Sequence, residues 1–363
     1  MTLESILQSR RFDLPYLISI SGKLSSDDLN TILHNFNQEI QASGELFQGI
    51  FKEYYSSGGK EEIDADVFKK DIESITNGVL KVIALYLNGS PALAYSHFDE
   101  TIKINKLKYL LTNRTKILNR NSSFYRLRSD GGFTTPITPL QLFHVPFELR
   151  FKIDTKRYSI PGFPCLYVSD SLHIACKEMD IDDSTNQLKS IKAVRLTNNA
   201  KLRYLDVAAR DISTLLAGKS KFVMGKDDSV ILEIFEYALL YPIIAACHTK
   251  IDYSKMHAPF KIEYVVPQIL LQWFRDNNRF THGIRYFSNR IDYATGSSKI
   301  GAYNYVFPVK ASCKDGYCQN LQKIFNSTDV LIANGFGHTK STLVEKITEL
   351  QDVLLGEGAK ILV

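Results

Sequence analysis

The segment that decides the fold, residues 124–178, reads FYRLRSDGGFTTPITPLQLFHVPFELRFKIDTKRYSIPGFPCLYVSDSLHIACKE. Its short apolar runs are separated by Gly, Pro, Ser and Asp, which is typical of strands and turns rather than helices. The opening run, FYRLR, predicts a strand at 124–127 that places Arg126 and Arg128 close to a sheet. We therefore expect a sheet-containing domain to begin just before this segment.

The second half of the segment carries polar residues of three types at its element boundaries. Arg157 and Tyr158 stand immediately before a Pro-Gly-Phe-Pro turn, and the run Leu-Tyr-Val that follows predicts a strand containing Tyr167. A Ser-Asp-Ser sequence then supplies side-chain oxygens that can cap a helix, and this helix contains Glu178. Arg, Tyr and Glu thus mark a strand, a turn, a second strand and a helix in order.

Upstream of residue 120 the chain has the periodicity of helices, because apolar residues recur every three or four positions. Helices are predicted at 29–40, 65–87 and 91–112. We therefore predict an all-α domain at 1–120 and a sheet domain at 121–363. The remaining predicted elements are strands at 166–168, 191–196, 202–207 and 303–309, and helices at 171–179, 263–277 and 342–355, the last beginning with a Thr342–Glu345 capping box.

Composition and charge exclude several classes of protein. Hydrophobic residues make up 44% and charged residues 23% of the 363, which excludes a disordered, collagen-like or coiled-coil chain. A net charge of +5 is too small for a dedicated nucleic-acid binder, and the basic segment 101–130 is interpreted as a solvated helix face and linker. The most apolar stretch, 237–249, is shorter than the roughly 20 residues of a membrane-spanning helix. Five cysteines, an odd number, favour a reducing compartment over a disulfide framework, so we expect a cytoplasmic protein.

Sequence motifs for metal and nucleotide chemistry are missing from the chain. It contains no HExxH, P-loop, GxSxG or paired CxxC, and its eight His show no metal-ligand spacing. The Gly-rich stretch 335–342 has the wrong spacing for either phosphate-binding motif and is interpreted as a turn before the last helix. We therefore predict no metal and no bound cofactor.

The Arg, Tyr and Glu residues of the deciding segment have a common chemical use if they converge. Guanidinium groups bind phosphate, an aromatic ring stacks on a flat base, and a carboxylate stabilises a developing cation. This combination suits cleavage of the bond between nicotinamide and ribose in NAD+, whose transition state is an oxocarbenium ion. Each residue also has an ordinary structural interpretation. An Arg commonly lies on the surface, a Tyr in the core and a Glu on a solvated helix face.

Several motifs of the chain resemble the RES-domain toxins of bacterial toxin–antitoxin modules. They are Tyr125-Arg126, Arg157-Tyr158 with a following Pro-Gly turn, Leu-Tyr-Val-Ser at 166–169 and the helical Glu178. Further on, Val-Pro-Gln at 266–268 and Gly-Ile-Arg-Tyr-Phe-Ser at 283–288 resemble the closing block of the family and offer Ser288 as its named Ser. The resemblance covers roughly 124–310. It departs from the family where Lys-Arg-Tyr-Ser stands in place of Gly-Arg-Trp-Asn, in a long insert at 130–155, and at 208–262.

The resemblance implies an α+β fold of the ADP-ribosyltransferase type, with a split mixed or antiparallel sheet around an NAD+ cleft. It implies that Arg157, Tyr167, Glu178 and Ser288 are catalytic, with Glu178 stabilising the ribosyl cation and Tyr167 stacking on nicotinamide. Arg126 would hold the pyrophosphate together with Arg157, and the binding set would also include Arg128, Tyr158 and Ser169. NAD+ is then a substrate, cleaved by phosphorolysis or hydrolysis, with inorganic phosphate or water as the acceptor.

The resemblance also implies an NAD-depleting toxin held inactive by a separate antitoxin with a helix-turn-helix domain. Residues 1–120 lie outside the minimal toxin and would serve an accessory, regulatory or dimerisation role. Two alternatives use the same cleft: a protein mono-ADP-ribosyltransferase, and a catalytically silent module that binds a nucleotide or a partner.

Overall fold

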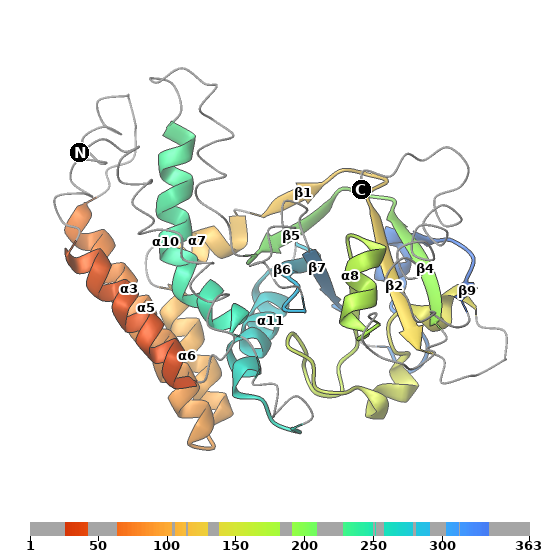
Figure 1. The fold of residues 1–363 in the computed structure, drawn as a ribbon, viewed down its shortest axis with the longest axis horizontal. Helices are drawn as coiled ribbons and strands as arrows, with labels where there is room; N and C mark the ends of the chain where they lie inside the picture. Colours follow the sequence, from red (N-terminus) through yellow and green to blue (C-terminus); the bar gives the residue numbers. More distant parts are fainter. Residues whose placement is uncertain are drawn as a thin grey trace. The chain divides into compact units, whose positions relative to one another are not determined.

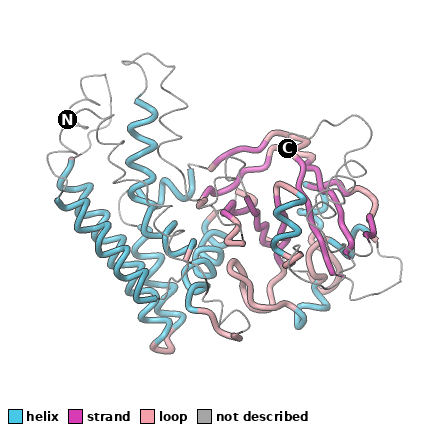
Figure 2. The backbone as a smooth tube through the Cα atoms, in the orientation of Figure 1, coloured by secondary structure: helices cyan, strands magenta, loops and turns pink. Residues whose placement is uncertain are grey.

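The structure, a computed structural model, describes residues 26–42, 64–103, 106–113, 115–129, 138–181, 191–208, 228–249, 251, 258–278, 281–290, 303–311 and 313–333. The described residues form two compact units (Figure 1). The helical unit draws on Met1–Arg114, Lys156–Tyr158 and Val207–Asn277, and the sheet unit draws on Thr115–Thr155, Ser159–Asp206 and Asn278–Val363. All the described strands belong to the sheet unit (Figure 2).

The helical unit is built from amphipathic helices whose apolar faces meet. Its elements are α3 (Ser26–Ala42), α5 (Ala65–Leu87), α6 (Pro91–Lys103), α7 (Lys106–Asn113), α10 (Asp228–His248), the 3-10 turn η4 (Ile262–Tyr264) and α11 (Val265–Asn277). The carboxylate of Asp64 caps α5 by accepting hydrogen bonds from the amides of Asp66 and Val67 at 2.8 and 3.2 Å. Such a cap contributes about 1 kcal/mol to helix stability. Gly89, with φ of 77°, then turns the chain into α6.

A glycine sets the close approach of α5 to α6. A Cβ atom on Gly78 would collide with the side chain of Thr101, which lies on the facing helix. Both residues belong to a buried interface that includes Ile75, Phe98 and Ile102. The absence of a side chain at position 78 therefore determines how closely the two helices pack.

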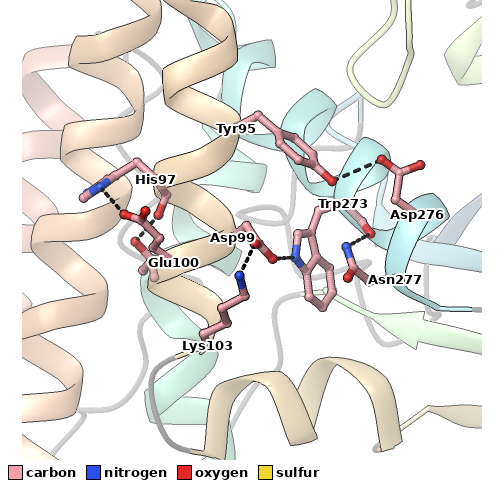
Figure 3. A network of polar contacts seen from close by, with 9 residues as sticks. Tyr95, His97, Asp99, Glu100, Lys103, Trp273, Asp276 and Asn277 are labelled. Atoms are coloured by element: carbon pink, nitrogen blue, oxygen red, sulfur yellow. Dashed lines mark hydrogen bonds and ion pairs between the residues drawn. The ribbon is translucent and has the colours of Figure 1, made fainter.

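Polar contacts join α6 to α11 at the edge of this unit (Figure 3). The indole Nε1 of Trp273 donates to Oδ1 of Asp99 at 2.9 Å, and Lys103 pairs with the other carboxylate oxygen at 2.6 Å. The Tyr95 hydroxyl donates to Oδ2 of Asp276 at 3.1 Å, one turn further along α11. Burial opposes ionisation of Asp99, but the hydrogen bonds from Lys103 and Trp273 prevail and lower its pKa. The Asp99 carboxylate thus takes part both in an ion pair within α6 and in a hydrogen bond from α11.

The helical unit differs from the all-α N-terminal domain predicted from the sequence. Helices α10 and α11, which follow the first five strands of the chain, join the N-terminal helices instead of the sheet. The apolar stretch 237–249, interpreted as too short to span a membrane, lies within the C-terminal half of α10 and just beyond it, and nearly all of it is buried. None of the helices that the structure describes has the length and apolar content needed to cross a bilayer.

Nine strands of the described chain form one curled mixed sheet (Figure 1). They are β1 (Lys116–Leu118), β2 (Ser123–Ser129), β3 (Cys165–Ser169), β4 (Ile191–Asn198), β5 (Leu202–Asp206), β6 (Gly283–Phe287), β7 (Tyr303–Pro308), β8 (Phe325–Ser327) and β9 (Leu331–Ala333). Their order is β1-β5-β6-β7-β3-β2-β4-β8, and β9 also pairs with β4. Only β5 and β6 run parallel, and the other pairs of strands are antiparallel. The predicted combination of helices with a mixed sheet is confirmed, whereas the ADP-ribosyltransferase type of the fold stays a prediction.

The two faces of the sheet bury different clusters. On one face Phe124 packs with Leu166, Val168, Phe307 and further apolar residues. On the other face, α8 (Leu172–Glu178) covers β2 and β4. Strand alternation explains the division, because Phe124 and Tyr125 are consecutive residues and their side chains point to opposite faces. The sheet unit is completed by 3-10 turns η1 (Pro139–Leu142) and η2 (Phe147–Lys152) and by α12 (Gln319–Ile324).

Most elements predicted within the described residues are confirmed, with ends shifted by a few positions. The helix expected at 91–112 is instead described as two helices, α6 and α7. Strand β6 and helix α10 were not predicted as elements. The helix predicted at 342–355 and the Gly-rich turn at 335–342 lie outside the described residues. All five cysteines are free thiols.

Candidate functional site

The site is built around the C-terminal end of α8. The Ser171 hydroxyl caps the helix by accepting a hydrogen bond from the Ile174 amide at 3.2 Å. At the other end, the amides of Asp180 and Ile181 donate to the carbonyls of Lys177 and Cys176. Asp180 has a left-handed φ of 53°, which completes a Schellman motif. Glu178 is the last helical residue, so this motif fixes its backbone while its side chain is exposed.

Two buried donors converge on one oxygen of the Glu178 carboxylate. The Ser288 hydroxyl donates to Oε1 at 2.6 Å, and the Asn304 side-chain amide donates to the same oxygen at 2.6 Å. Ser288 is 0% exposed and directly follows β6, whereas Asn304 is 3% exposed and lies within β7. Hydrogen bonds to a charged acceptor are about twice as strong as neutral ones, so Oε1 is firmly held. No hydrogen bond from the described residues reaches Oε2.

The hydrogen-bond chain continues from Asn304 to β3. The Ser169 hydroxyl donates to Oδ1 of Asn304 at 2.6 Å, and these two residues lie opposite each other in the β3–β7 ladder. On the outer side, the amide of Arg290 donates to the Ser288 hydroxyl oxygen at 3.2 Å. The Arg290 guanidinium also pairs with Asp180 at 2.6 Å, which joins the segment after β6 to the end of α8 a second time.

Tyr167 lies on the same side of β3 as Ser169, because the two are separated by one residue. Burial, reinforced by the neighbouring Cys165 and Tyr286, raises the pKa of its phenol well above 10. The hydroxyl therefore stays protonated at neutral pH and can donate a hydrogen bond. The residue as a whole is partly exposed, unlike the fully buried Leu166 beside it.

The two arginines of β2 lie on the sheet face opposite to Tyr125. Arg126 donates from Nη1 to the Tyr167 carbonyl at 2.7 Å, which bridges β2 and β3 where their pairing is limited to Tyr125 and Ser169. Burial and the nearby Arg128 charge lower the pKa of Arg126 to about 10, so the group is still cationic at neutral pH. Arg128 is exposed and donates to the Gln141 carbonyl at 3.1 Å.

Arg157 and Tyr158 belong to the helical unit. The Arg157 guanidinium donates to the Cys247 carbonyl at 3.1 Å and lies 5.1 Å from the centre of the Tyr264 ring. Tyr158 is fully buried. Burial raises the pKa of the Cys247 thiol to about 12, against the opposing effects of the Tyr158 hydrogen bond and the Arg157 charge.

The sheet unit thus brings together three of the residues selected from the sequence, Glu178, Ser288 and Ser169, the last through Asn304. Tyr167 and Arg126 lie on adjoining strands of the same unit, whereas Arg157 and Tyr158 make the contacts described above within the helical unit. Asn304 was not selected from the sequence. The sequence signal that could have identified it is a single amide side chain within the otherwise aromatic and aliphatic run Tyr-Asn-Tyr-Val-Phe at 303–307.

In comparisons with known proteins, no family profile and no solved structure matches the chain. A protein of Bacillus subtilis (strain 168) named "Putative toxin YopC" is 28% identical to it over 312 residues. The aligned region covers 85% of this chain and 66% of the Bacillus protein. The chain therefore spans about two thirds of the length of this relative.

Proposed function

We propose that the protein is a toxin that cleaves the nicotinamide–ribose bond of NAD+, with Glu178 as the residue that stabilises the ribosyl cation. The observation that carries the proposal is the Glu178 carboxylate itself. One of its oxygens is held by Ser288 and Asn304, and the other has no partner among the described residues. A carboxylate fixed in this way can accept a hydrogen bond from a ribose hydroxyl and stabilise the positive charge that develops at C1.

The toxin part of the proposal is supported by the named Bacillus relative and by the motifs that resemble RES-domain toxins. In that assignment, which for the two arginines follows the resemblance alone, Tyr167 stacks on nicotinamide and Arg126 and Arg157 bind the pyrophosphate. The fold is then of the ADP-ribosyltransferase type, and NAD+ acts as a substrate with phosphate or water as the acceptor. A separate antitoxin would keep the enzyme inactive in its own cell.

The test is NAD+ consumption by the purified full chain, followed by NMR with and without inorganic phosphate. We expect free nicotinamide to appear, with ADP-ribose-1″-phosphate as the second product if phosphate is the acceptor and ADP-ribose if water is. Glu178→Gln should lower turnover at least about 100-fold, because the amide cannot stabilise a cation as a carboxylate does. Glu100→Gln is the matched control, since Glu100 is an exposed carboxylate on α6 of the helical unit.

Three results would contradict the proposal in different ways. Full NAD+-cleaving activity of Glu178→Gln would rule out Glu178 as the residue that stabilises the ribosyl cation. Label from NAD+ on a protein, without free ADP-ribose, would instead identify a mono-ADP-ribosyltransferase. NAD+ binding without turnover by the folded chain would identify a silent binding module.

A further inference from the structure

The Asn304 side chain occupies a position where an amide is costly unless both of its ends are bonded. It is 3% exposed in β7, which lies between β6 and β3 in the interior of the sheet. Burying an unbonded amide costs several kcal/mol, about 2–7 depending on the reference state. Both ends are satisfied here, Oδ1 by the Ser169 hydroxyl and Nδ2 by the Glu178 carboxylate.

We propose that Asn304 is a positioning residue for Glu178, and that Ser169 fixes the direction in which the Asn304 amide points. The inference rests on the proposed function to the extent that Glu178 is catalytic. Ser169, which the family resemblance placed in the binding set, thereby acts through Asn304.

The direction of the amide follows from the chemistry of its neighbours. A carboxylate oxygen only accepts hydrogen bonds, so the amide must present Nδ2 to Glu178 and Oδ1 to the opposite side. The Ser169 hydroxyl donates to that Oδ1 at 2.6 Å and so favours this orientation. A flipped amide would place two acceptor oxygens in contact at Glu178.

The consequence for Glu178 is a carboxylate held from two strands at once. Asn304 on β7 and Ser288 after β6 both donate to Oε1, so rotation of the carboxyl group would break two short hydrogen bonds. An exposed Glu side chain at a helix end would otherwise sample several rotamers. Loss of the Asn304 contact should therefore lower the fraction of Glu178 in its reactive geometry, which affects kcat rather than the binding of NAD+.

The first measurement is NMR of the full chain labelled with 15N-asparagine, and it needs no turnover. The Asn304 amide signal, identified by its loss in Asn304→Ala, should shift in Glu178→Gln, because its acceptor is then a neutral amide instead of a carboxylate. In Ser169→Ala the Asn304 signal should also move, because the amide is less well fixed when Oδ1 loses its donor. Asn198 is the internal control, since its buried amide donates to the carbonyls of Asn119 and Ala200 and its signal should stay in place in both variants.

The second measurement is steady-state kinetics with NAD+. Asn304→Ala should lower kcat about 10- to 100-fold with KM nearly unchanged, the size expected from misplacing a catalytic group. Ser169→Ala should give a smaller loss, which Ser169→Thr restores because it keeps the hydroxyl. Asn326→Ala, at an exposed asparagine on β8, should behave as the unaltered protein.

The two measurements separate failure of this inference from failure of the proposed function. If the unaltered chain consumes no NAD+, the proposed function fails, and the NMR comparison of the variants still decides whether Asn304 holds Glu178. An Asn304 signal that ignores Glu178→Gln would overturn the positioning role, as would full kcat in Asn304→Ala. If Asn304→Ala does not fold, the same decision rests on Ser169→Ala and its rescue by Ser169→Thr.

Discussion

The hydroxyl of Ser288 donates to Oε1 of Glu178 at 2.6 Å, although 110 residues separate the two in the chain. Glu178 ends a helix that covers one face of the sheet, and Ser288 follows a strand in the middle of that sheet. Next to this part-buried bond, whose donor Ser288 is 0% exposed, lies the more exposed ion pair between Asp180 and Arg290. The two contacts join the same segments, but their difference in burial predicts different contributions.

Ser288→Ala should lower kcat for NAD+ cleavage about 10- to 100-fold, because the carboxylate then keeps only the Asn304 donor. Arg290→Ala should lower it no more than about fivefold, since an exposed ion pair contributes about 0–1 kcal/mol. Both are measured by steady-state kinetics on the full chain, with circular dichroism to check folding. A larger effect of Arg290→Ala than of Ser288→Ala would mean that the ion pair, and not the hydroxyl, holds this segment.

Gly283→Ala should destabilise the sheet unit by about 1–3 kcal/mol, the cost of overpacking a filled interior. A Cβ atom at this position would lie 2.5 Å from both the Val306 carbonyl oxygen and Cδ1 of Phe307. The change should also reduce NAD+ cleavage, because β6 leads directly to Ser288.

Gly89→Ala is the contrasting control for this substitution. Nothing lies within 4 Å of the added carbon, so its cost of about 1 kcal/mol arises only from the left-handed backbone. Urea unfolding and turnover measured on both variants should show lost stability in each and lost activity in Gly283→Ala alone. Unchanged stability of Gly283→Ala would mean that β6 and β7 separate easily.

Local patterns were sufficient for most of the elements around the site. The strand-like run FYRLR predicted β2, and the Ser-Asp-Ser cap predicted α8, because each signal lies within a few consecutive residues. The resemblance to a known family, rather than spacing, selected Ser288. The order of the strands could not be read locally, since β6 pairs with β5 and β7 across long separations in sequence.

Asn304 and helix α10 show why the rest was missed. An Asn in a strand reads as a weak strand former, and only the pairing of β7 with β3 reveals that it faces Ser169. The apolar stretch at the end of α10 has no polar face to mark which neighbours it packs against. Its place among the N-terminal helices therefore depends on tertiary packing that the pattern does not specify.

Trp273→Phe should destabilise the helical unit by about 2–4 kcal/mol. The change removes the hydrogen bond to Asp99 and leaves a gap where the larger ring was, and Trp273 is 0% exposed. Tyr95→Phe, which breaks the exposed hydrogen bond to Asp276 on the same two helices, should cost less than about 1 kcal/mol. Urea unfolding at neutral pH measures both. Equal losses of unfolding free energy in the two variants would mean that the buried indole of Trp273 contributes no more than the exposed hydrogen bond of Tyr95.

His144 joins the η1–η2 segment to the start of α12. The Cys318 amide donates to its Nε2 at 2.8 Å, and its Nδ1 lies 2.8 Å from the Val145 carbonyl, so the ring is held as the neutral Nδ1–H form. The rings of Phe147 and Tyr317 pack edge-on against it. Burial and the Arg126 charge lower the pKa of the imidazole, against the hydrogen bond to Val145.

The lowered pKa of His144 predicts that the protein loses stability as pH falls below about 6.5, the ordinary value for histidine. The unfolded chain takes up a proton there that the folded protein does not, which gives a slope of up to about 1.4 kcal/mol per pH unit. His144→Gln should be less stable at pH 7.5 but show a shallower slope down to pH 5.5 in urea unfolding. Tyr317→Phe alters the same packing without removing a histidine and should keep the original slope. An identical slope in His144→Gln would assign the acid sensitivity to the other histidines with lowered pKa, His173 and His282.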